Sequence, residues 1–312
     1  MKIVIPGGSG QVGTILARDF HRDGHDVVVL SRRAQSRPWR VVMWDGKNLD
    51  GWQGELEGAE VVISLAGRSV NCRYNATNRS EMLQSRVLST RVVGQAVAAA
   101  VHPPRVWLQA STATIYAHRY DAANDERSGI VGGEEAGAPS TWRFSIDVAR
   151  AWERAFDEAV TPRTRKIAMR SAITMSPDRG GVFATLVGLV RLGLGGRAGD
   201  GRQFVSWIHE RDFVAAVRWL IAHEATDGIV NIASPNPLPN AEFMRVLRHA
   251  CGVPFGLPAS KWMLEIGALV MRTETELILK SRRVVPARLL DAGFTFNFPN
   301  WPDAATDLCR RM

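Results

Sequence analysis

The sequence contains little cysteine and no long apolar segment. Its three cysteines, Cys72, Cys251 and Cys309, are far apart and form no CxxC or Cys/His spacing. This excludes the usual zinc sites and a disulfide-stabilised secreted scaffold. Apolar runs such as 96–101 are far shorter than the roughly 18 to 20 residues of a membrane-spanning helix, and the apolar N-terminal stretch is too short for a secretory signal. We therefore expect a cytoplasmic protein with neither a membrane span nor a metal site.

Positive charge is in excess, but it is not concentrated in one segment. The 312 residues include 39 Lys and Arg against 31 Asp and Glu, which gives a formal charge of +8. No run of five basic residues occurs, so the pattern does not indicate a nucleic-acid-binding tail. The excess favours a local anion site instead. We predict a small-molecule substrate, with an anionic one favoured, and no nucleic-acid or membrane partner.

Short β-branched segments alternate with segments of helical periodicity in the first half of the chain. Lys2–Ile5 reads as a strand and Gln11–Asp23 as a helix, and similar pairs follow. This alternation predicts an α/β fold with a Rossmann-like, doubly wound parallel sheet. Later glycines and prolines interrupt helical stretches, which predicts a smaller, mainly helical C-terminal lobe. We assign residues 1–171 to the Rossmann-like domain and 172–312 to the lobe, interleaved with the first domain and ending in a tail over about 252–312.

A glycine-rich motif lies between the first predicted strand and helix. Gly7, Gly10 and Gly13 give the spacing GxxGxxG. At such positions glycine allows a tight turn, close approach of the backbone to a pyrophosphate, and close packing of helix on strand. The helix N-terminus then offers free N–H groups to phosphate oxygens. The alternative is a purely structural turn. The residues predicted to bind a dinucleotide here are Gly7, Ser9, Gly10, Gln11, Val12 and Gly13.

The end of the second predicted strand carries no acidic residue. An Asp or Glu at this point normally bonds the ribose 2′-hydroxyl of NAD. This chain has Ser31, Arg32 and Arg33 instead. A hydroxyl and guanidinium groups suit a 2′-phosphate, which a carboxylate would repel. We therefore predict NADP as the cofactor, bound in part by Ser31 and Arg32; the alternative is that both arginines are solvated loop charges.

Three motifs give the chain a family resemblance. The glycine motif is joined by Ser64-Leu65-Ala66-Gly67 after the fourth predicted strand and by Ser111-Thr112-Ala113-Thr114-Ile115-Tyr116 after the fifth. With these motifs the chain resembles the extended short-chain dehydrogenase/reductase superfamily over most of its length. The resemblance implies a cofactor and a substrate that meet at the carboxyl ends of the strands.

Later segments narrow the resemblance. Trp207–Asp212, Asn231–Pro235, Arg283–Pro286 and Gly293–Phe296 look like the atypical sugar nucleotide epimerase family with its own C-terminal extension. That family is similar to a human epimerase family protein of the short-chain dehydrogenase type. The match in the tail is the most specific of these.

The resemblance also implies roles for single residues. Thr112 matches the substrate-orienting Ser or Thr of the superfamily, although an ordinary strand-end hydroxyl is the alternative reading. Glu81 and Arg86 lie on a predicted helix that contacts the cofactor in the superfamily; read alone, each is an exposed helix charge. The same comparison assigns cofactor contacts to the loop residues Leu65, Ala66 and Gly67.

The superfamily's catalytic dyad is missing. Active members use a Tyr as acid–base group and a Lys four residues later that lowers its pKa. None of the three tyrosines here is followed by Lys at that spacing. With Glu153 as the acidic residue that commonly follows the dyad, the two positions fall on Ser145 and Ala149. A serine hydroxyl is far too weak an acid to replace the phenol unaided.

Two functions remain open at this point. The first is an NADP(H)-binding epimerase-like oxidoreductase that transfers hydride at a carbinol or carbonyl carbon and lacks the YxxxK dyad. The second is a non-catalytic NADP(H)-binding regulator or interaction protein that has kept only the cofactor site. Thr112 favours the enzyme, and the absence of both dyad residues favours the regulator.

Overall fold

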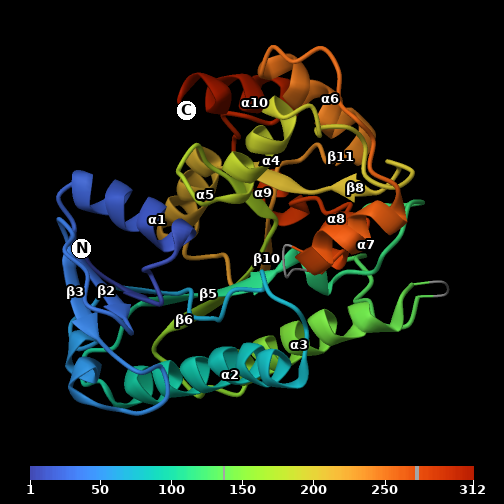
Figure 1. Ribbon diagram of the computed structural model, residues 1–312. Helices are drawn as coiled ribbons and strands as arrows, with labels where there is room; N and C mark the ends of the chain where they lie inside the picture. The colour runs from blue at the N-terminus through green and yellow to red at the C-terminus, as the bar shows by residue number, and fades with distance from the viewer. Residues whose placement is uncertain (136–137, 271–273) are drawn as a thin grey trace.

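The computed structural model describes residues 1–135, 138–270 and 274–312 (Figure 1). The strands are β1 (Lys2–Pro6), β2 (Asp26–Ser31), β3 (Arg40–Met43), β4 (Val61–Ser64), β5 (Val106–Thr112), β6 (Arg165–Ser171), β7 (Ile173–Met175), β8 (Phe204–Val205), β9 (Trp207–His209), β10 (Gly228–Ile232) and β11 (Leu238–Pro239). The helices are α1 (Gln11–Arg22), α2 (Ala76–Ala99), α3 (Arg143–Asp157), α4 (Val182–Arg191), α5 (Glu210–Ala222), α6 (Asn240–Ala250), α7 (Lys261–Val270), α8 (Glu276–Leu279), α9 (Ala287–Asp291) and α10 (Trp301–Arg310).

Seven strands form one parallel sheet in the order β10-β6-β5-β4-β1-β2-β3. The central strands are apolar and buried along almost their whole length, as in β2, because helices cover both faces. β1 pairs with β2 on one side and β4 on the other, so the winding direction reverses beside β1. Ligands of such sheets bind where the strand order reverses, at the carboxyl ends of the strands. The predicted doubly wound α/β fold is confirmed.

Helices lie in two layers about this sheet (Figure 1). Phe20 of α1 and Phe213 of α5 belong to the buried cluster on one face, together with Ile3 and Ile63 of the sheet. Val93 of α2 belongs to the cluster on the other face. Both layers hold the carboxyl ends of β1 and β4 in fixed positions.

The last strand of the sheet comes from late in the chain. The sequence pattern predicts no strand at Gly228–Ile232, yet β10 pairs in parallel with β6. The preceding helix, α5, covers the sheet as well. Its apolar positions recur at helical spacing, but nothing in that local pattern says which surface they cover. The polypeptide therefore enters the lobe, returns to the sheet and leaves it again.

The rest of the C-terminal half forms its own apolar core. Phe183 of α4, Phe243 of α6 and Trp301 of α10 are buried in one cluster with Trp207. The tail then contacts the first half: the N–H of Asn124 donates to the Arg283 carbonyl at 2.7 Å. No helix within 1–135, 138–270 or 274–312 is long and apolar enough to cross a membrane.

Candidate functional site

The glycine motif forms a close-packed turn with one open side. Gly7 has φ +74°, and a Cβ on it would lie 2.5 Å from the Cα of Ala66. A Cβ on Gly13 would lie 2.4 Å from the Cα of Gly8. A Cβ on Gly10, in contrast, would meet no atom of the described residues within 4 Å. The turn thus has the tight packing that the motif predicts and an open space at Gly10, where a pyrophosphate fits.

The N-terminus of α1 faces this open space, and no side chain caps its first backbone N–H groups. Gly10 is the N-cap residue, no side chain caps the helix, and its first turn has no acidic residue. The buried Nε2 of Gln11 has no hydrogen-bond partner in the part of the chain that the structure describes. Free helix N–H groups and an unpaired amide suit an anion. These observations fit a dinucleotide phosphate at Ser9–Gly13.

Ser31 and the two arginines lie at the end of β2, as predicted. Ser31 is buried, and its Oγ accepts a hydrogen bond from the Arg33 N–H at 3.2 Å. Arg32 and Arg33 are exposed, and neither has an ion pair with a described residue. The positive charge beside the predicted ribose site is therefore not neutralised by neighbouring carboxylates.

The loop after β4 completes this end of the molecule. Arg86 of α2 is buried below it, and a Cβ on Gly67 would lie 3.2 Å from its Cζ. The guanidinium lies 4.9 Å from the Trp152 ring, and burial lowers its pKa to about 10. It forms no ion pair with any carboxylate of the described residues. Glu81 is exposed and pairs with Arg68 of the same loop. The predicted cofactor contacts of Arg86 and Glu81 stay predictions, and only Arg86 has the burial expected of a built site.

Thr112 and Tyr116 have local structural roles. The Oγ1 of Thr112 accepts from the Thr114 N–H at 3.1 Å and caps the short 3-10 turn Ala113–Ile115. The Tyr116 hydroxyl donates to Oδ1 of Asn231 at 2.9 Å. Burial raises the pKa of Tyr116, although Arg170 lies 4.9 Å from its ring. Tyr116 is therefore a poor candidate for the missing acid, whereas Thr112 keeps a hydroxyl at the end of β5.

The two dyad positions differ in their surroundings. Ala149 has no exposed surface and packs in an apolar cluster. Ser145 is partly exposed, and its Oγ donates to Oε2 of Glu276 at 2.6 Å. Glu153, which set the register, is held by Arg170 at 2.7 Å and by the Ser111 hydroxyl at 2.5 Å. The position predicted for the superfamily's tyrosine is thus in direct contact with an acid from the tail.

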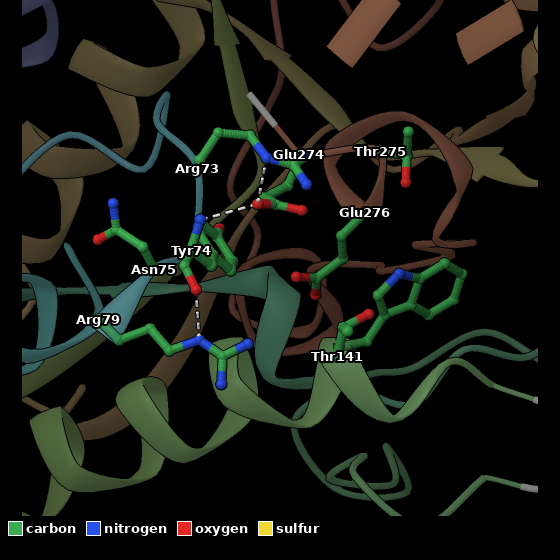
Figure 2. A pocket seen from close by; sticks show the side chains of 9 residues that line it. Arg73, Tyr74, Asn75, Arg79, Thr141, Glu274, Thr275 and Glu276 are labelled. Carbon is green, nitrogen blue, oxygen red and sulfur yellow. Dashed lines mark hydrogen bonds and ion pairs between the residues drawn. The ribbon is translucent and has the colours of Figure 1, made fainter. Parts of the chain in front are cut away.

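A pocket of about 290 Å³ opens beside this contact (Figure 2). Its lining comes from the loop before α2 and the first turns of α2, from the 3-10 turn before α3, and from the segment that leads into α8. It consists of Arg73, Tyr74, Asn75, Arg79, Thr141, Trp142, Glu274, Thr275 and Glu276. Figure 2 shows the Glu276 side chain pointing into the pocket from the opposite side to Tyr74. The N–H of Tyr74 donates to Glu274 at 2.8 Å, which ties the loop to the tail.

Sequence reasoning did not identify Tyr74 or Glu276 as site residues. Neither belongs to a motif, and Ser145 and Glu276 are 131 positions apart. The nearest available signal was the family-like tail, which showed that the lobe has an extra segment but not where its side chains point.

His209 and Asp212 serve the lobe. The Nε2 of His209 lies 3.1 Å from Oδ2 of Asp307, and its ring stacks on Phe298. Asp212 accepts from the backbone N–H groups of Asn297 and Phe298. Both hold the tail in place, and no group of three or more potential ligands for a metal ion occurs among the described residues.

Comparison with known proteins agrees with this architecture. Residues 3–233 match the model of the NAD dependent epimerase/dehydratase family, well over half of the chain. The chain belongs to this family. Residues 259–308 match a domain of unknown function, DUF1731, which covers most of the tail.

Several relatives match over nearly their full length. The chain is 31% identical to epimerase family protein SDR39U1 of Bos taurus over 305 residues, which are 96% of each chain. The crystal structure of human epimerase family protein SDR39U1 (isoform2) with NADPH has a TM-score of 0.86 at 26% identity and covers 100% of both chains. The structure of a nucleoside-diphosphate sugar epimerase from Corynebacterium glutamicum has a TM-score of 0.76 at 28% identity, over 99% of this chain and 58% of that one. The family resemblance drawn from the sequence is confirmed.

Proposed function

We propose that this protein is an NADP(H)-binding, epimerase-like oxidoreductase that acts on a small carbonyl or carbinol compound. The observation that carries the proposal is the glycine turn at Gly7–Gly13, combined with the cations Arg32 and Arg33 after β2, which form no ion pair with a described residue. The crystal structure of the human relative contains NADPH, which supports the same cofactor here.

The chain's own residues would have distinct tasks. The backbone of the α1 N-terminus binds the pyrophosphate, and Ser31 and Arg32 bind the 2′-phosphate. Buried Arg86 holds the loop at Gly67 and adds positive charge below it. When bound, the nicotinamide supplies or accepts the hydride, and Thr112 orients the reacting oxygen of the substrate. Pocket residues beside Ser145 then exclude water around the substrate.

The cofactor test compares NADPH and NADH by calorimetric titration. The wild type should bind NADPH more tightly. Arg32→Asp should weaken NADPH about tenfold or more, because a charge-assisted hydrogen bond is replaced by repulsion, and it should leave NADH nearly unchanged. Arg310→Asp, an exposed arginine in α10, is the matched charge control. Equal affinity of the wild type for both cofactors would refute NADP(H) specificity.

A non-catalytic regulator is the second candidate, and one observation favours it. Ala149, at the position predicted for the superfamily's lysine, is buried in an apolar cluster, which supports the absence of the usual dyad. NADPH binding without turnover of any carbonyl compound would favour this candidate.

A further inference from the structure

The pocket beside Ser145 contains an acid that α3 does not provide. Glu276 is 2% exposed and belongs to the first turn of α8. Its Oε2 accepts the Ser145 hydroxyl at 2.6 Å. Its Oε1 is buried and has no hydrogen-bond partner among the residues that the structure describes. Oε2 is therefore fixed by Ser145, whereas Oε1 has no hydrogen-bond partner among the described residues. Glu276 also belongs to the lining of the pocket.

Two buried cations of the tail face the same carboxyl group. The Nζ of Lys280 lies 3.8 Å from Oε1 of Glu276 and donates to the Thr114 carbonyl at 2.8 Å. Arg282 donates to the carbonyls of Leu277 and Glu276 at 2.9 and 3.1 Å. Because Thr114 belongs to the turn that Thr112 caps, the network connects the tail to the end of β5.

Burial shifts these groups toward their neutral forms. Burial raises the pKa of the Glu276 carboxyl, while the Ser145 hydrogen bond and the charges of Arg282 and Lys280 oppose the rise. Burial lowers the pKa of Lys280 to about 8. The pocket also contains the phenol of Tyr74, and burial raises the pKa of this group as well. A raised pKa brings a carboxyl group closer to neutral pH but takes a phenol further from it, so Glu276 is the better proton donor.

We propose that Glu276 is the general acid–base residue of the substrate site and replaces the tyrosine missing from α3. Ser145 is a positioning residue that fixes the carboxyl group, and Lys280 stabilises the carboxylate once the proton has left. The C-terminal extension thus completes the active site. This inference rests on the proposed oxidoreductase function.

The proton step follows from these contacts. In the reducing direction the carbonyl carbon takes the hydride that the cofactor supplies, and the C=O π pair moves to the oxygen. That oxygen forms its new O–H bond with the proton of the Glu276 carboxyl group, which becomes a carboxylate facing the Lys280 ammonium. Water at the pocket mouth then returns a proton to Glu276. The pocket volume of about 290 Å³ is near the lower end for ligand sites, which favours a small carbonyl substrate.

The test uses Glu276→Gln in the full chain, with NADPH and a panel of small aldehydes and ketones. Turnover should fall by about 100-fold or more, because general acid catalysis typically contributes that much. Calorimetric NADPH affinity should stay at the wild-type value, since Glu276 lies outside the predicted nucleotide cradle. Asp303→Asn, which changes an exposed carboxyl of α10 in the same tail, is the matched control.

A second readout does not depend on turnover. Infrared titration of the wild type should show a protonated-carboxyl band that persists above the ordinary pH range of glutamic acid and that Glu276→Gln lacks. Lys280→Met and Ser145→Ala should each move its midpoint to higher pH, because both partners favour the carboxylate. A Glu276 carboxyl group without these contacts would show neither shift, and the turnover of Glu276→Gln decides whether the titrating group takes part in the reaction.

The outcomes separate this inference from the function on which it rests. Glu276→Gln with wild-type turnover, or a midpoint that both partner variants leave unchanged, would overturn the role of Glu276 alone. Loss of turnover in Tyr74→Phe with normal turnover in Glu276→Gln would assign the proton to Tyr74 instead. Wild-type protein that binds NADPH and turns over no carbonyl compound would overturn both the oxidoreductase function and this inference.

Discussion

The two ends of the candidate site are built in different ways. The cofactor end consists of short segments that each follow a strand of the sheet: the turn at Gly7–Gly13, the pair Arg32 and Arg33, and the loop at Gly67. The substrate end joins a loop residue, Tyr74, to Ser145 of α3 and to Glu276 of the tail. Backbone geometry therefore decides the first end, and long-range packing decides the second. The two ends should respond differently to mutation.

The largest effect is expected where the tail is anchored. Trp301 is 1% exposed, stacks on Phe243 at 4.1 Å and donates its indole N–H to the Phe243 carbonyl at 2.9 Å. Trp301→Ala should lower the free energy of unfolding by about 3 to 5 kcal/mol, since it leaves a cavity and removes the indole hydrogen bond. Urea denaturation would measure this loss.

The control for Trp301→Ala is Trp262→Ala in the same tail. Trp262 is 65% exposed, so its loss should change stability little. NADPH affinity of folded Trp301→Ala should remain near wild type if the cofactor end is independent of the tail. A large loss of NADPH affinity would show instead that the two ends are coupled.

A change at Gly10 should affect the opposite end. Gly10→Val places a side chain in the open space beside the α1 N-terminus, where the pyrophosphate is expected. NADPH affinity should fall about 100-fold or more, while the free energy of unfolding changes by only about 1 kcal/mol, the cost of a poor N-cap. Fluorescence titration with NADPH and urea denaturation would measure the two quantities.

Gly188→Val is the matched control for Gly10→Val. Gly188 lies in α4, and its Cβ position is equally free of described atoms within 4 Å. A valine there should leave NADPH binding intact. Normal NADPH binding by folded Gly10→Val would contradict the placement of the pyrophosphate.

This contrast explains what the sequence could predict. The fold and the cradle follow from local rules: β-branched strands, helical periodicity, and glycines such as Gly7, whose positive φ other residues rarely adopt. The strand β10 was missed because glycine and proline interruptions around it hide the alternation. Glu276 was missed because α8 has only four residues and no periodic pattern, and because its contact with Ser145 depends on how the tail returns to the sheet.

Ala149, at the position predicted for the superfamily's lysine, allows a comparison between a buried and an exposed lysine. Ala149→Lys would place an ammonium group in an apolar cluster that includes Ile115 and Val284. We expect a loss of about 2 to 3 kcal/mol of stability, because a buried charge lacks a partner there. Ala98→Lys, at an exposed position of α2, should cost far less in thermal or urea denaturation. Equal stability of the two variants would mean that the lysine at 149 reaches solvent or the cofactor end.

The smallest expected effect is a pH dependence of stability at the substrate end. Burial raises the pKa of Glu276 in the folded protein, so its protonated form favours folding. That contribution is complete below the pKa of the unfolded chain, about 4.3, and is lost as pH rises through the folded value. Glu276→Gln lacks this titration, so the stability of the wild type relative to the variant should decrease with pH. The decrease amounts to about 1.4 kcal/mol for each unit by which the folded pKa is raised.

The measurement is urea denaturation of wild type and Glu276→Gln from pH 4 to 7. This range ends below the pKa of about 8 that Lys280 has beside Glu276, so that lysine stays charged in the wild type. The other groups facing Glu276, namely Ser145, Arg282 and Glu274, are unchanged in the variant. If the stability of wild type relative to Glu276→Gln instead rises with pH, the cations of the tail outweigh burial, and Glu276 is a carboxylate at neutral pH that acts as a base rather than as an acid.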